Sequence, residues 1–418
     1  MPAVYEASEE FAKRLDERDP LGRFRDRFEI PPAIYVNGNS LGLMPKAARA
    51  RVEQELADWA RLGVEGHFAA KTPWFSYHEI FRESGAALVG AIPGEVVMMN
   101  GLTVNLHLMM ASFYRPKAGR HKILIEDGAF PSDTYAVESQ LAVHGFDAAE
   151  GLIRQRPREG EATLRTDDVV AAIEERGDEI ALVLLPGVQY YTGQLLDIPA
   201  ITAAAHARGC VAGWDLAHAA GNVPLALHDG DVDFAVWCSY KYLNAGPGAV
   251  AGCFVHERHG ADPKLPRLAG WWGNDPATRF RMDAERTFVP RAGADGWQLS
   301  NPPILAMAPL AASLEIFSEA GMAALRTKSV TLTGYLEWLL ARPGARRFEV
   351  ITPKDPAARG CQLSLRVLDE PKAVLAALEA AGVIADHRPP DVIRVAPVPL
   401  YNTFHEVWRL ARILSGAA

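Results

Sequence analysis

Between residues 120 and 256 the chain alternates short apolar runs with amphipathic helical stretches, and this pattern restricts the possible folds more than any other feature. The run KILIED precedes a helical stretch near 132–145, and IALVLLP precedes one near 197–208; CVAGWDL, DFAVWCSY and AVAGCFVH come next. Such runs alternating with helices indicate βαβ units and a mainly parallel sheet covered on both faces. The sequence therefore predicts an α/β fold, in which ligands bind beyond the carboxyl ends of the strands.

The flanking segments predict a second, smaller domain. Helical stretches near 45–62 and 76–91 precede the alternating block, and NPPILAMAPLAASLEIF begins a long helix after it. The tail combines strand-like pieces, CQLSLRV and DVIRVAP, with helical ones, PKAVLAALEAAG and TFHEVWRLARIL. We expect an N-terminal helical segment associated with the small domain (1–60), a large α/β domain (61–303) and a C-terminal small α+β domain (304–418).

The composition argues against several classes of protein. The 418 residues are 49% hydrophobic, which is enough for a large core, and the net charge of −8 argues against a nucleic-acid surface. No apolar run reaches the length of a membrane span. The N-terminal residues lack the basic and apolar regions of a signal peptide, so we expect a cytoplasmic protein. Four scattered cysteines without a CxxC pair indicate free thiols, and we expect no metal site.

Lys241 and Asp215 both follow apolar runs of the predicted sheet. Lys241 lies in CSYKYLNAGPG; in a dry pocket a lysine has a lowered pKa and becomes a nucleophile toward carbonyls. Asp215 ends the run CVAGWDL, three residues before His218, and a buried carboxylate there needs a positive partner such as a protonated pyridine nitrogen. Taken alone, each residue has an ordinary interpretation: a strand-end lysine that reaches solvent, a turn aspartate and a core imidazole.

Two further segments predict sites for an anion and for a planar ring. Gly101 precedes Thr103 at a helix start, where free N–H groups, the helix dipole and the hydroxyl form an anion cup. After the run that ends in Glu126, Phe130 offers a face for stacking and Asp133 offers a hydrogen-bonding carboxylate. Taken singly, these are a helix cap and a hydrophobic staple.

Together, the four signals predict pyridoxal 5'-phosphate (PLP) as the cofactor. Its phosphate would lie on the helix start at Thr103 and its ring on Phe130. The ring nitrogen would meet Asp215, and Lys241 would form a Schiff base with the aldehyde. Four weak signals in this order on an α/β sheet are much stronger than any one of them.

The motif GNSLG raises a rival class of enzyme. It matches GxSxG, the nucleophile elbow of serine hydrolases, with Ser40 as the nucleophile. However, the predicted helix begins after Pro45 instead of at Ser40, and only 39 residues precede this serine. A third class, a non-catalytic binding module on a cofactor fold, is opposed by the intact Lys241.

Long stretches of the sequence resemble the kynureninase family of PLP enzymes, which has the aspartate aminotransferase fold (fold type I). They run in order from about residue 35 to the C-terminus: GNSLGLMP, MMNGLTVNLHLMM, FPSDTYAVESQL, GWDLAHAAGNVPL, DFAVWCSYKYLNAGPG, LAGWWG, LSNPPI and IRVAPVPLYNTFHEV. The resemblance implies a large PLP-binding domain with a mainly parallel seven-stranded sheet, plus the small α+β domain. The N-terminus and the loops near 156–170 and 343–360 diverge.

The resemblance also implies roles for individual residues. Lys241 would form the internal aldimine, Asp215 would pair with the pyridine nitrogen, and Tyr240 would contact the phosphate and take part in proton transfer. Further cofactor contacts would come from Leu102, Thr103, Phe130, Asp133, His218, Trp271 and Asn301. Substrate contacts would come from Arg394, which would grip the α-carboxylate, and from Ser40, His67, Ser300 and Asn301. The ordinary interpretations are that one of Trp271 and Trp272 belongs to the core and that His67 is a loop residue.

The implied reaction is hydrolytic Cβ–Cγ cleavage of L-kynurenine to anthranilate and L-alanine, in tryptophan catabolism or NAD precursor synthesis. The implied assembly is a homodimer with active sites near the interface, without nucleic-acid or membrane partners. Polar donors at His67, Ser300 and Asn301 would favour 3-hydroxykynurenine, because such a site discriminates against a substrate that lacks the hydroxyl. The nearest alternatives are an aminotransferase or a cysteine desulfurase; the latter needs a reactive loop cysteine, whereas Cys361 precedes a strand-like stretch.

Overall fold

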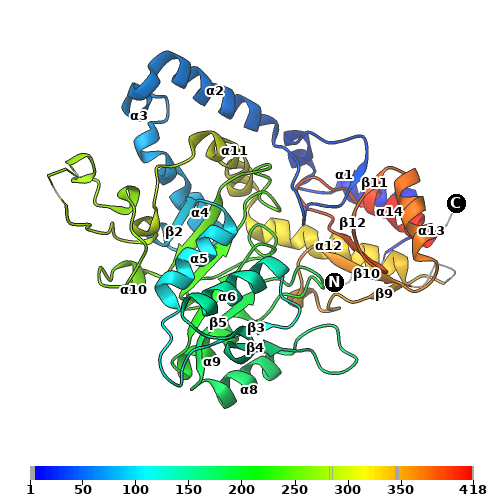
Figure 1. Ribbon diagram of the computed structural model, residues 1–418. Coiled ribbons are helices and arrows are strands. Elements are labelled where there is room, and N and C mark those ends of the chain that lie inside the picture. The colour runs from blue at the N-terminus through cyan, green and yellow to red at the C-terminus, as the bar shows by residue number, and fades with distance from the viewer. Residues whose placement is uncertain (1–4, 282, 285, 344–347, 417–418) are drawn as a thin grey trace.

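A seven-stranded sheet forms the centre of the molecule in the computed structural model, which describes residues 5–281, 283–284, 286–343 and 348–416 (Figure 1). The strands lie in the order β2-β8-β7-β6-β5-β3-β4. Six of them run parallel, and β8 runs antiparallel to both of its neighbours, β2 and β7. Their bounds are β2 (Val96–Met99), β3 (Lys122–Glu126), β4 (Leu152–Gln155), β5 (Ile180–Pro186), β6 (Val211–Asp215), β7 (Phe234–Trp237) and β8 (Ala251–Val255). The prediction of a mainly parallel seven-stranded sheet is confirmed.

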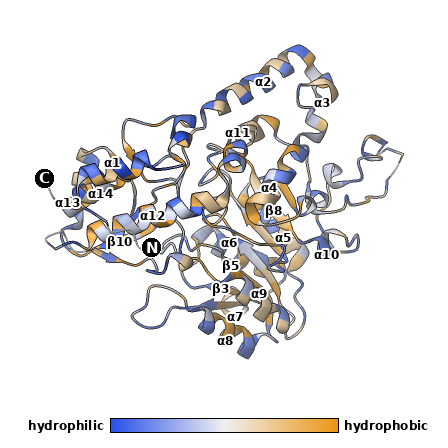
Figure 2. Ribbon diagram, turned by 180° about the vertical axis from the view of Figure 1, so that it is seen from behind, coloured by the Kyte–Doolittle hydropathy of each residue, from blue (hydrophilic) through white to orange (hydrophobic). Residues whose placement is uncertain are grey.

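Both faces of this sheet are buried, because its strands are apolar throughout. Side chains alternate between the faces along each strand: Met98 and Leu185 pack into the core on one side, and Val97 and Leu184 into the core on the other. Helices cover both faces: α5 (Leu102–Phe113) packs beside α6 (Pro131–Val143), and α8 (Thr166–Arg176) beside α9 (Ile198–Ala207). Figure 2 shows the hydrophobic colour gathering in this central region.

The remaining helices of the large α/β region lie around the seven-stranded sheet and in the segments that connect its strands. Their bounds are α2 (Lys46–Leu62), α3 (Gly66–Ala69), the 3₁₀ helix η3 (Trp74–Phe81), α4 (Arg82–Val89), α7 (Ala148–Gly151), α10 (Glu257–Gly260) and α11 (Ile304–Ala320). Helices α2 and α3 project away from the body of the molecule (Figures 1 and 2). Helix α11 packs along α2.

The C-terminal residues build a separate hydrophobic core around an antiparallel sheet of order β12-β13-β10-β9. Its elements are α12 (Met322–Leu340), β9 (Phe348–Val350), β10 (Leu363–Val367), α13 (Pro371–Ala380), β12 (Asp386–Arg388), β13 (Val392–Val395) and α14 (Phe404–Ser415). The N-terminal segment joins this core: α1 (Glu9–Glu17) packs on α14, and β1 (Ile34–Tyr35) pairs with β11 (Val383–Ile384). The domain boundaries at 60 and 303 remain predictions.

Among the described residues, no single helix is long and apolar enough to cross a membrane, although α11 and α12 reach that threshold as a pair bent by 82°. Most residues of α11 are buried, and the helix packs against α2, α4 and η3. The break between the two helices falls at Gly321, whose φ of 75° ends α11.

The parallel strands β3, β5 and β6 end on the same edge of the sheet, and α5 begins directly after β2 on that edge. Loops therefore bring residues from four distant parts of the sequence together there, as the sequence predicts.

Candidate functional site

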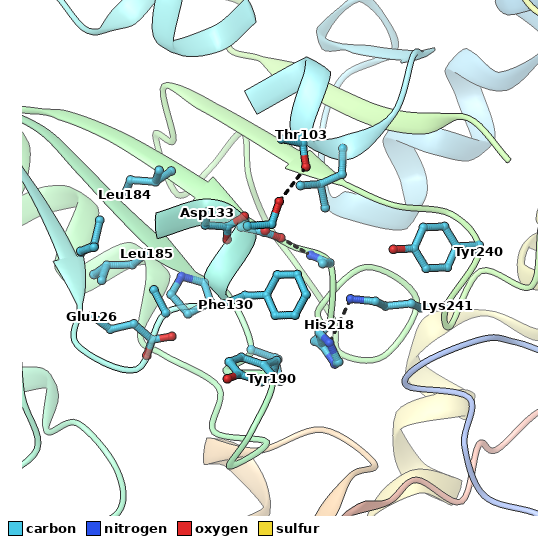
Figure 3. A pocket seen from close by; sticks show the side chains of 18 residues that line it. Thr103, Glu126, Phe130, Asp133, Leu184, Leu185, Tyr190, His218, Tyr240 and Lys241 are labelled. Atoms are coloured by element: carbon cyan, nitrogen blue, oxygen red, sulfur yellow. Dashed lines mark hydrogen bonds between the residues drawn. The ribbon is translucent and has the colours of Figure 1, made fainter. Parts of the chain in front are cut away.

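A pocket that is partly open to solvent lies at the carboxyl ends of these strands (Figure 3). It gathers eight of the residues predicted from the sequence, namely Leu102, Thr103, Phe130, Asp133, Asp215, His218, Tyr240 and Lys241. Residues without a predicted role complete its wall, among them Glu126, Ser132, Leu184, Leu185, Pro186, Val188 and Tyr190.

Two helix N-termini meet at one end of the pocket. Helix α5 begins at Leu102 behind Gly101, which contributes no side-chain cap, so the N–H groups of its first turn lack intrahelical acceptors. Helix α6 begins at Pro131, also without a side-chain cap. The hydroxyls of Thr103 and Ser132 lie 3.2 Å apart between the two starts. Free N–H groups, two hydroxyls and two helix dipoles make this end of the pocket suited to a phosphate.

Three carboxyl groups line the pocket. Asp215, at the end of β6, accepts a hydrogen bond from the N–H of Ala217 at 2.6 Å. Burial, followed by repulsion from Asp215, raises the pKa of Asp133 well above its usual range. Burial likewise raises the pKa of Glu126 to about 7, although a hydrogen bond from Gln189 opposes the rise. A cationic ligand would relieve the repulsion among these groups.

Lys241 reaches into the pocket from the loop after β7. Its Nζ lies 3.0 Å from His218 Nε2 and 5.8 Å from the centre of the Phe130 ring (Figure 3). Burial, followed by the charges of Lys241, Arg394 and Arg388, holds the pKa of His218 well below its usual range. The imidazole is therefore neutral and accepts a hydrogen bond from Lys241 through Nε2, which leaves the proton on Nδ1.

The Phe130 ring forms a wall of the pocket together with Tyr190. The two rings meet edge to face, with centres 5.2 Å apart. Tyr240 lies on the other side of Lys241, whose Nζ is 6.0 Å from the centre of the Tyr240 ring. Burial, followed by the neighbouring Cys238, raises the pKa of the Tyr240 phenol.

Six of the predicted residues do not line this pocket: Ser40, His67, Trp271, Ser300, Asn301 and Arg394. Arg394 is buried on β13 and bonded to Asp386 and to the carbonyl of Tyr190. His67 lies on α3, where its Nδ1 is 3.0 Å from the carbonyl of Val64. These six roles remain predictions.

Four of these six residues, Trp271, Ser300, Asn301 and Ser40, lie in ring contacts or at exposed positions outside the pocket. Trp271 packs against Trp272 at 4.9 Å between ring centres, and Trp272, not Trp271, is the fully buried member of the pair. Ser300 and Asn301 are exposed, and so is Ser40. Ser40 lies in a turn six residues before α2 begins at Lys46, so it lacks the helix start that a nucleophile elbow requires.

Sequence reasoning assigned no role to Glu126, Ser132 or Tyr190. Glu126 ends an apolar strand in the same way as Asp215, and Ser132 directly follows the start of a helix; both signals are readable in the sequence. Tyr190 follows the end of β5 by four residues in a loop with no motif, so only the fold reveals its place in the wall.

Another cluster of possible metal ligands lies at the opposite edge of the sheet, where Glu95, His228 and His256 bring ligand atoms within 4.8 Å of one another. Glu95 Oε1 already accepts hydrogen bonds from His228 Nδ1 (2.9 Å) and from the N–H of Glu257 (2.8 Å). His256 Nδ1 accepts the N–H of Arg258 at 3.3 Å. These hydrogen bonds connect the segments that meet at this edge of the sheet. The expected absence of a metal site remains a prediction.

Unpartnered polar atoms show that the residues of the pocket fit PLP. Asp133 Oδ1 and His218 Nδ1 are buried without a hydrogen-bond partner, which is costly unless a ligand supplies one. The pocket also offers a phosphate cup, an aromatic wall, strand-end carboxylates and a lysine within one space. PLP has a phosphate, a planar ring, a basic ring nitrogen and an aldehyde that match these groups.

Comparison with known proteins identifies the family. The kynureninase of Koribacter versatilis is 57% identical over 416 residues, which are 98% of this chain and 98% of that protein. The kynureninase of Myxococcus xanthus is 57% identical over 423 residues, covering 100% of this chain and 99% of that protein. The chain belongs to the kynureninase family. The family described as "Kynureninase C-terminal domain" also matches residues 325–414.

The structural comparison agrees with the fold expected for a kynureninase. C-DES, solved with glycine covalently linked to its PLP cofactor, has a TM-score of 0.77 at 19% identity and covers 93% of this chain and 98% of that one. This likeness shows the fold alone, which is fold type I of the PLP enzymes. Together, the kynureninase family and the fold make this chain a hydrolase with PLP as its cofactor.

The cysteine desulfurase alternative has no support in the pocket. Cys361 is buried before β10, and burial raises the pKa of its thiol to about 12, so it offers no reactive thiolate.

Proposed function

We propose that this chain hydrolyses L-kynurenine to anthranilate and L-alanine, with PLP held as a Schiff base on Lys241 Nζ. The observation that carries the proposal is the 57% identity to a kynureninase over 98% of the chain. The position of Lys241 in the pocket, beside His218, supports this point of attachment. When bound, PLP draws electrons away from the α-carbon of the substrate.

The residues of the pocket hold the cofactor from three sides. The first turns of α5 and α6, with the hydroxyls of Thr103 and Ser132, bind its phosphate. Phe130 stacks on the ring, and Asp215 keeps the ring nitrogen protonated. Asp133 and the N–H at His218 Nδ1 form the remaining polar contacts, which would satisfy the atoms that lack a partner.

Lys241 and Tyr240 move the protons of the reaction. Lys241 Nζ, once free, would remove the proton from Cα of the substrate and would return a proton to that carbon before L-alanine leaves. Burial raises the pKa of the Tyr240 phenol, so the phenol is protonated in the neutral range and has a proton that it can donate during the reaction. His218 is neutral and positions Lys241 through their 3.0 Å contact.

The substrate is held by its α-carboxylate, which pairs with Arg394 in the small domain. Water then adds to the γ-carbonyl carbon, the Cβ–Cγ bond breaks, and the former carbonyl carbon leaves as the carboxyl group of anthranilate. The electron pair of the broken bond remains on Cβ, which is protonated to give the methyl group of alanine.

Residues from a second copy of the chain complete the site. Trp271 and Asn301 belong to the predicted pocket but do not line it within one chain, which supports a contribution from the partner of a homodimer. Helices α2 and α3, and the 3₁₀ turn η2 (Gly63–Glu65) between them, carry exposed apolar side chains suited to such an interface, with Trp59 60%, Val64 75% and Phe68 62% exposed. An apolar groove beside α2 continues this surface, and we infer that the partner covers it.

The aryl ring of the substrate would meet Ser40, His67, Ser300 and Asn301 in the dimer. Their polar groups support a preference for 3-hydroxykynurenine over kynurenine. The ratio of kcat/KM for the two substrates, compared between the native protein and Asn301→Ala, tests this preference; the same ratio in both would exclude it.

The experiment that tests the reaction is direct. The purified protein, loaded with PLP, should release fluorescent anthranilate from L-kynurenine, with an equal amount of L-alanine. A protein that binds PLP but forms alanine without anthranilate, or neither product, would refute the proposal.

The four cysteines are free and buried. Free thiols are typical of proteins in a reducing compartment, which supports a cytoplasmic location for this protein.

A further inference from the structure

We infer that Arg394 does not bind the substrate carboxylate alone: Asp386 is the positioning residue that holds its guanidinium, and Arg388 supplies the net positive charge that selects a monoanion. The inference rests on the proposed function and concerns the same site. It adds two residues, both on β12, to the one residue that the sequence points to.

The three side chains form one bonded group. Asp386 on β12 lies directly opposite Arg394 on β13 in the strand register. Its carboxylate accepts two hydrogen bonds from Arg394, from Nε at 3.1 Å and from Nη2 at 2.7 Å. The same carboxylate accepts two more from Arg388, from Nε at 2.7 Å and from Nη2 at 3.2 Å. Asp386 is thus clamped between two guanidinium groups, each through its side edge.

The hydrogen bonds of Arg394 fix the orientation of its guanidinium group. Its side edge is taken by Asp386, and its Nη1 donates to the carbonyl of Tyr190 at 2.6 Å. Tyr190 is part of the pocket wall, and the guanidinium carbons of Arg388 and Arg394 lie 5.8 and 5.9 Å from the centre of its ring. The group therefore adjoins the pocket, and the charges of both arginines reach His218 inside it.

The charges of the group explain why two arginines are needed. Arg394 and Asp386 together carry no net charge, so their attraction for a carboxylate is weakened and acts only at short range. Arg388 brings the total to +1, which one carboxylate of the substrate neutralises. Arg388 is also the more accessible of the two cations: its side chain is 36% exposed, against 1% for Arg394. The arriving anion therefore meets Arg388 first.

Electrostatics support a permanently ionised Asp386. Burial alone would raise the pKa of this carboxyl, but the bonds and charges of Arg394 and Arg388 outweigh burial and hold the pKa below its usual value. The carboxylate keeps its grip on both arginines throughout the neutral range, so the group presents the same charge to the substrate.

The test uses a pair of non-reactive ligands that differ only in charge. 3-Benzoylpropionate has the aryl ketone and carboxylate of the substrate without its amine, and 3-benzoylpropionamide replaces the carboxylate by a neutral amide. Dissociation constants are measured by titration calorimetry on the PLP-loaded protein, for the native chain and for Arg388→Met and Asp386→Asn. Matched controls are Arg366→Met and Glu349→Gln, which break an ion pair on the same sheet whose arginine is 37% exposed.

Arg388→Met should reduce the preference for the acid over the amide by about tenfold, because the group loses its net charge. Asp386→Asn separates positioning from charge. It raises the group to +2, so attraction alone would tighten acid binding, whereas loss of the grip on Arg394 should weaken it by about tenfold. The controls should retain the native preference.

Unchanged acid preference in Arg388→Met, or tighter acid binding in Asp386→Asn, would overturn the inference. Kinetics with L-kynurenine give the second readout: both variants should raise KM more than they lower kcat. Native protein that prefers the acid ligand but forms no anthranilate would refute the proposed reaction and leave the carboxylate-binding group standing. Native protein that forms anthranilate without preferring the acid ligand would refute the carboxylate-binding group and leave the proposed reaction standing.

Discussion

Glu126 gives a quantitative test of the electrostatics of the pocket. Its pKa rises from the ordinary 4.5 to about 7, because burial opposes the charged form and Asp215 repels it, while Gln189 opposes the rise. A carboxyl whose pKa is raised by folding stabilises the folded state below its unfolded pKa, and this contribution is lost as the pH rises through the folded pKa. In the PLP-free protein, stability should therefore fall as the pH rises from 4.5 to about 7 because of this one group.

The size of the loss follows from the two pKa values. At about 1.4 kcal/mol for each pH unit, the rise from 4.5 to about 7 corresponds to about 3 kcal/mol. An unfolding entropy of about 2.1 cal/mol/K per residue converts this, for a chain of 418 residues, into a Tm change of about 3 to 4 °C. Glu126→Gln stays neutral at every pH and retains an amide oxygen to accept the hydrogen bond from Gln189.

The assay measures Tm of PLP-free protein by calorimetry across this pH range, for the native chain, Glu126→Gln and the exposed control Glu349→Gln. The Tm advantage of Glu126→Gln over the native chain should grow by about 3 to 4 °C from the acidic to the basic end of the range. A constant difference across the range would show that Glu126 titrates normally, and the account of its burial would be wrong.

Three further predictions concern the cofactor and the assembly. Thr103→Val and Ser132→Ala should each weaken PLP binding by about tenfold in an absorbance titration, because each removes one phosphate donor; unchanged affinity would mean that the phosphate lies elsewhere. Asp215→Asn should lower kcat by about a hundredfold or more while PLP remains bound, because the ring nitrogen loses its charged partner; a native kcat would contradict this role. Phe68→Glu should convert dimers to monomers in sedimentation, since a charge on an apolar contact opposes association; a native sedimentation profile would move the interface away from α3.

Much of the pocket was predictable because its residues follow the ends of apolar runs. Asp215 is the last residue of a buried strand, and Phe130 and Lys241 follow shortly after one. Parallel strands bring their carboxyl ends to one edge, so order along the chain was enough to predict convergence in space. His218 and Asp133 then followed as near neighbours in sequence.

Other features depend on contacts that the pattern does not contain. Strand direction cannot be read from apolar runs, so the antiparallel course of β8 was not predicted. The bonds of Asp386 to two arginines arise from the register of β12 and β13, which are separated by a short loop without a motif. Trp271 and Asn301 lie outside the pocket of their own chain, and one chain by itself does not determine what a second copy contributes.

The central claim is that Lys241 carries the cofactor, and peptide mapping after borohydride reduction tests it most directly. Reduction of the PLP-loaded protein turns a Schiff base into a stable secondary amine, which mass spectrometry locates in the digest. We predict a single phosphopyridoxyl group on Lys241, and none in Lys241→Ala treated in the same way. The group on another lysine of the native chain, or a native chain that binds PLP without becoming labelled, would contradict the account.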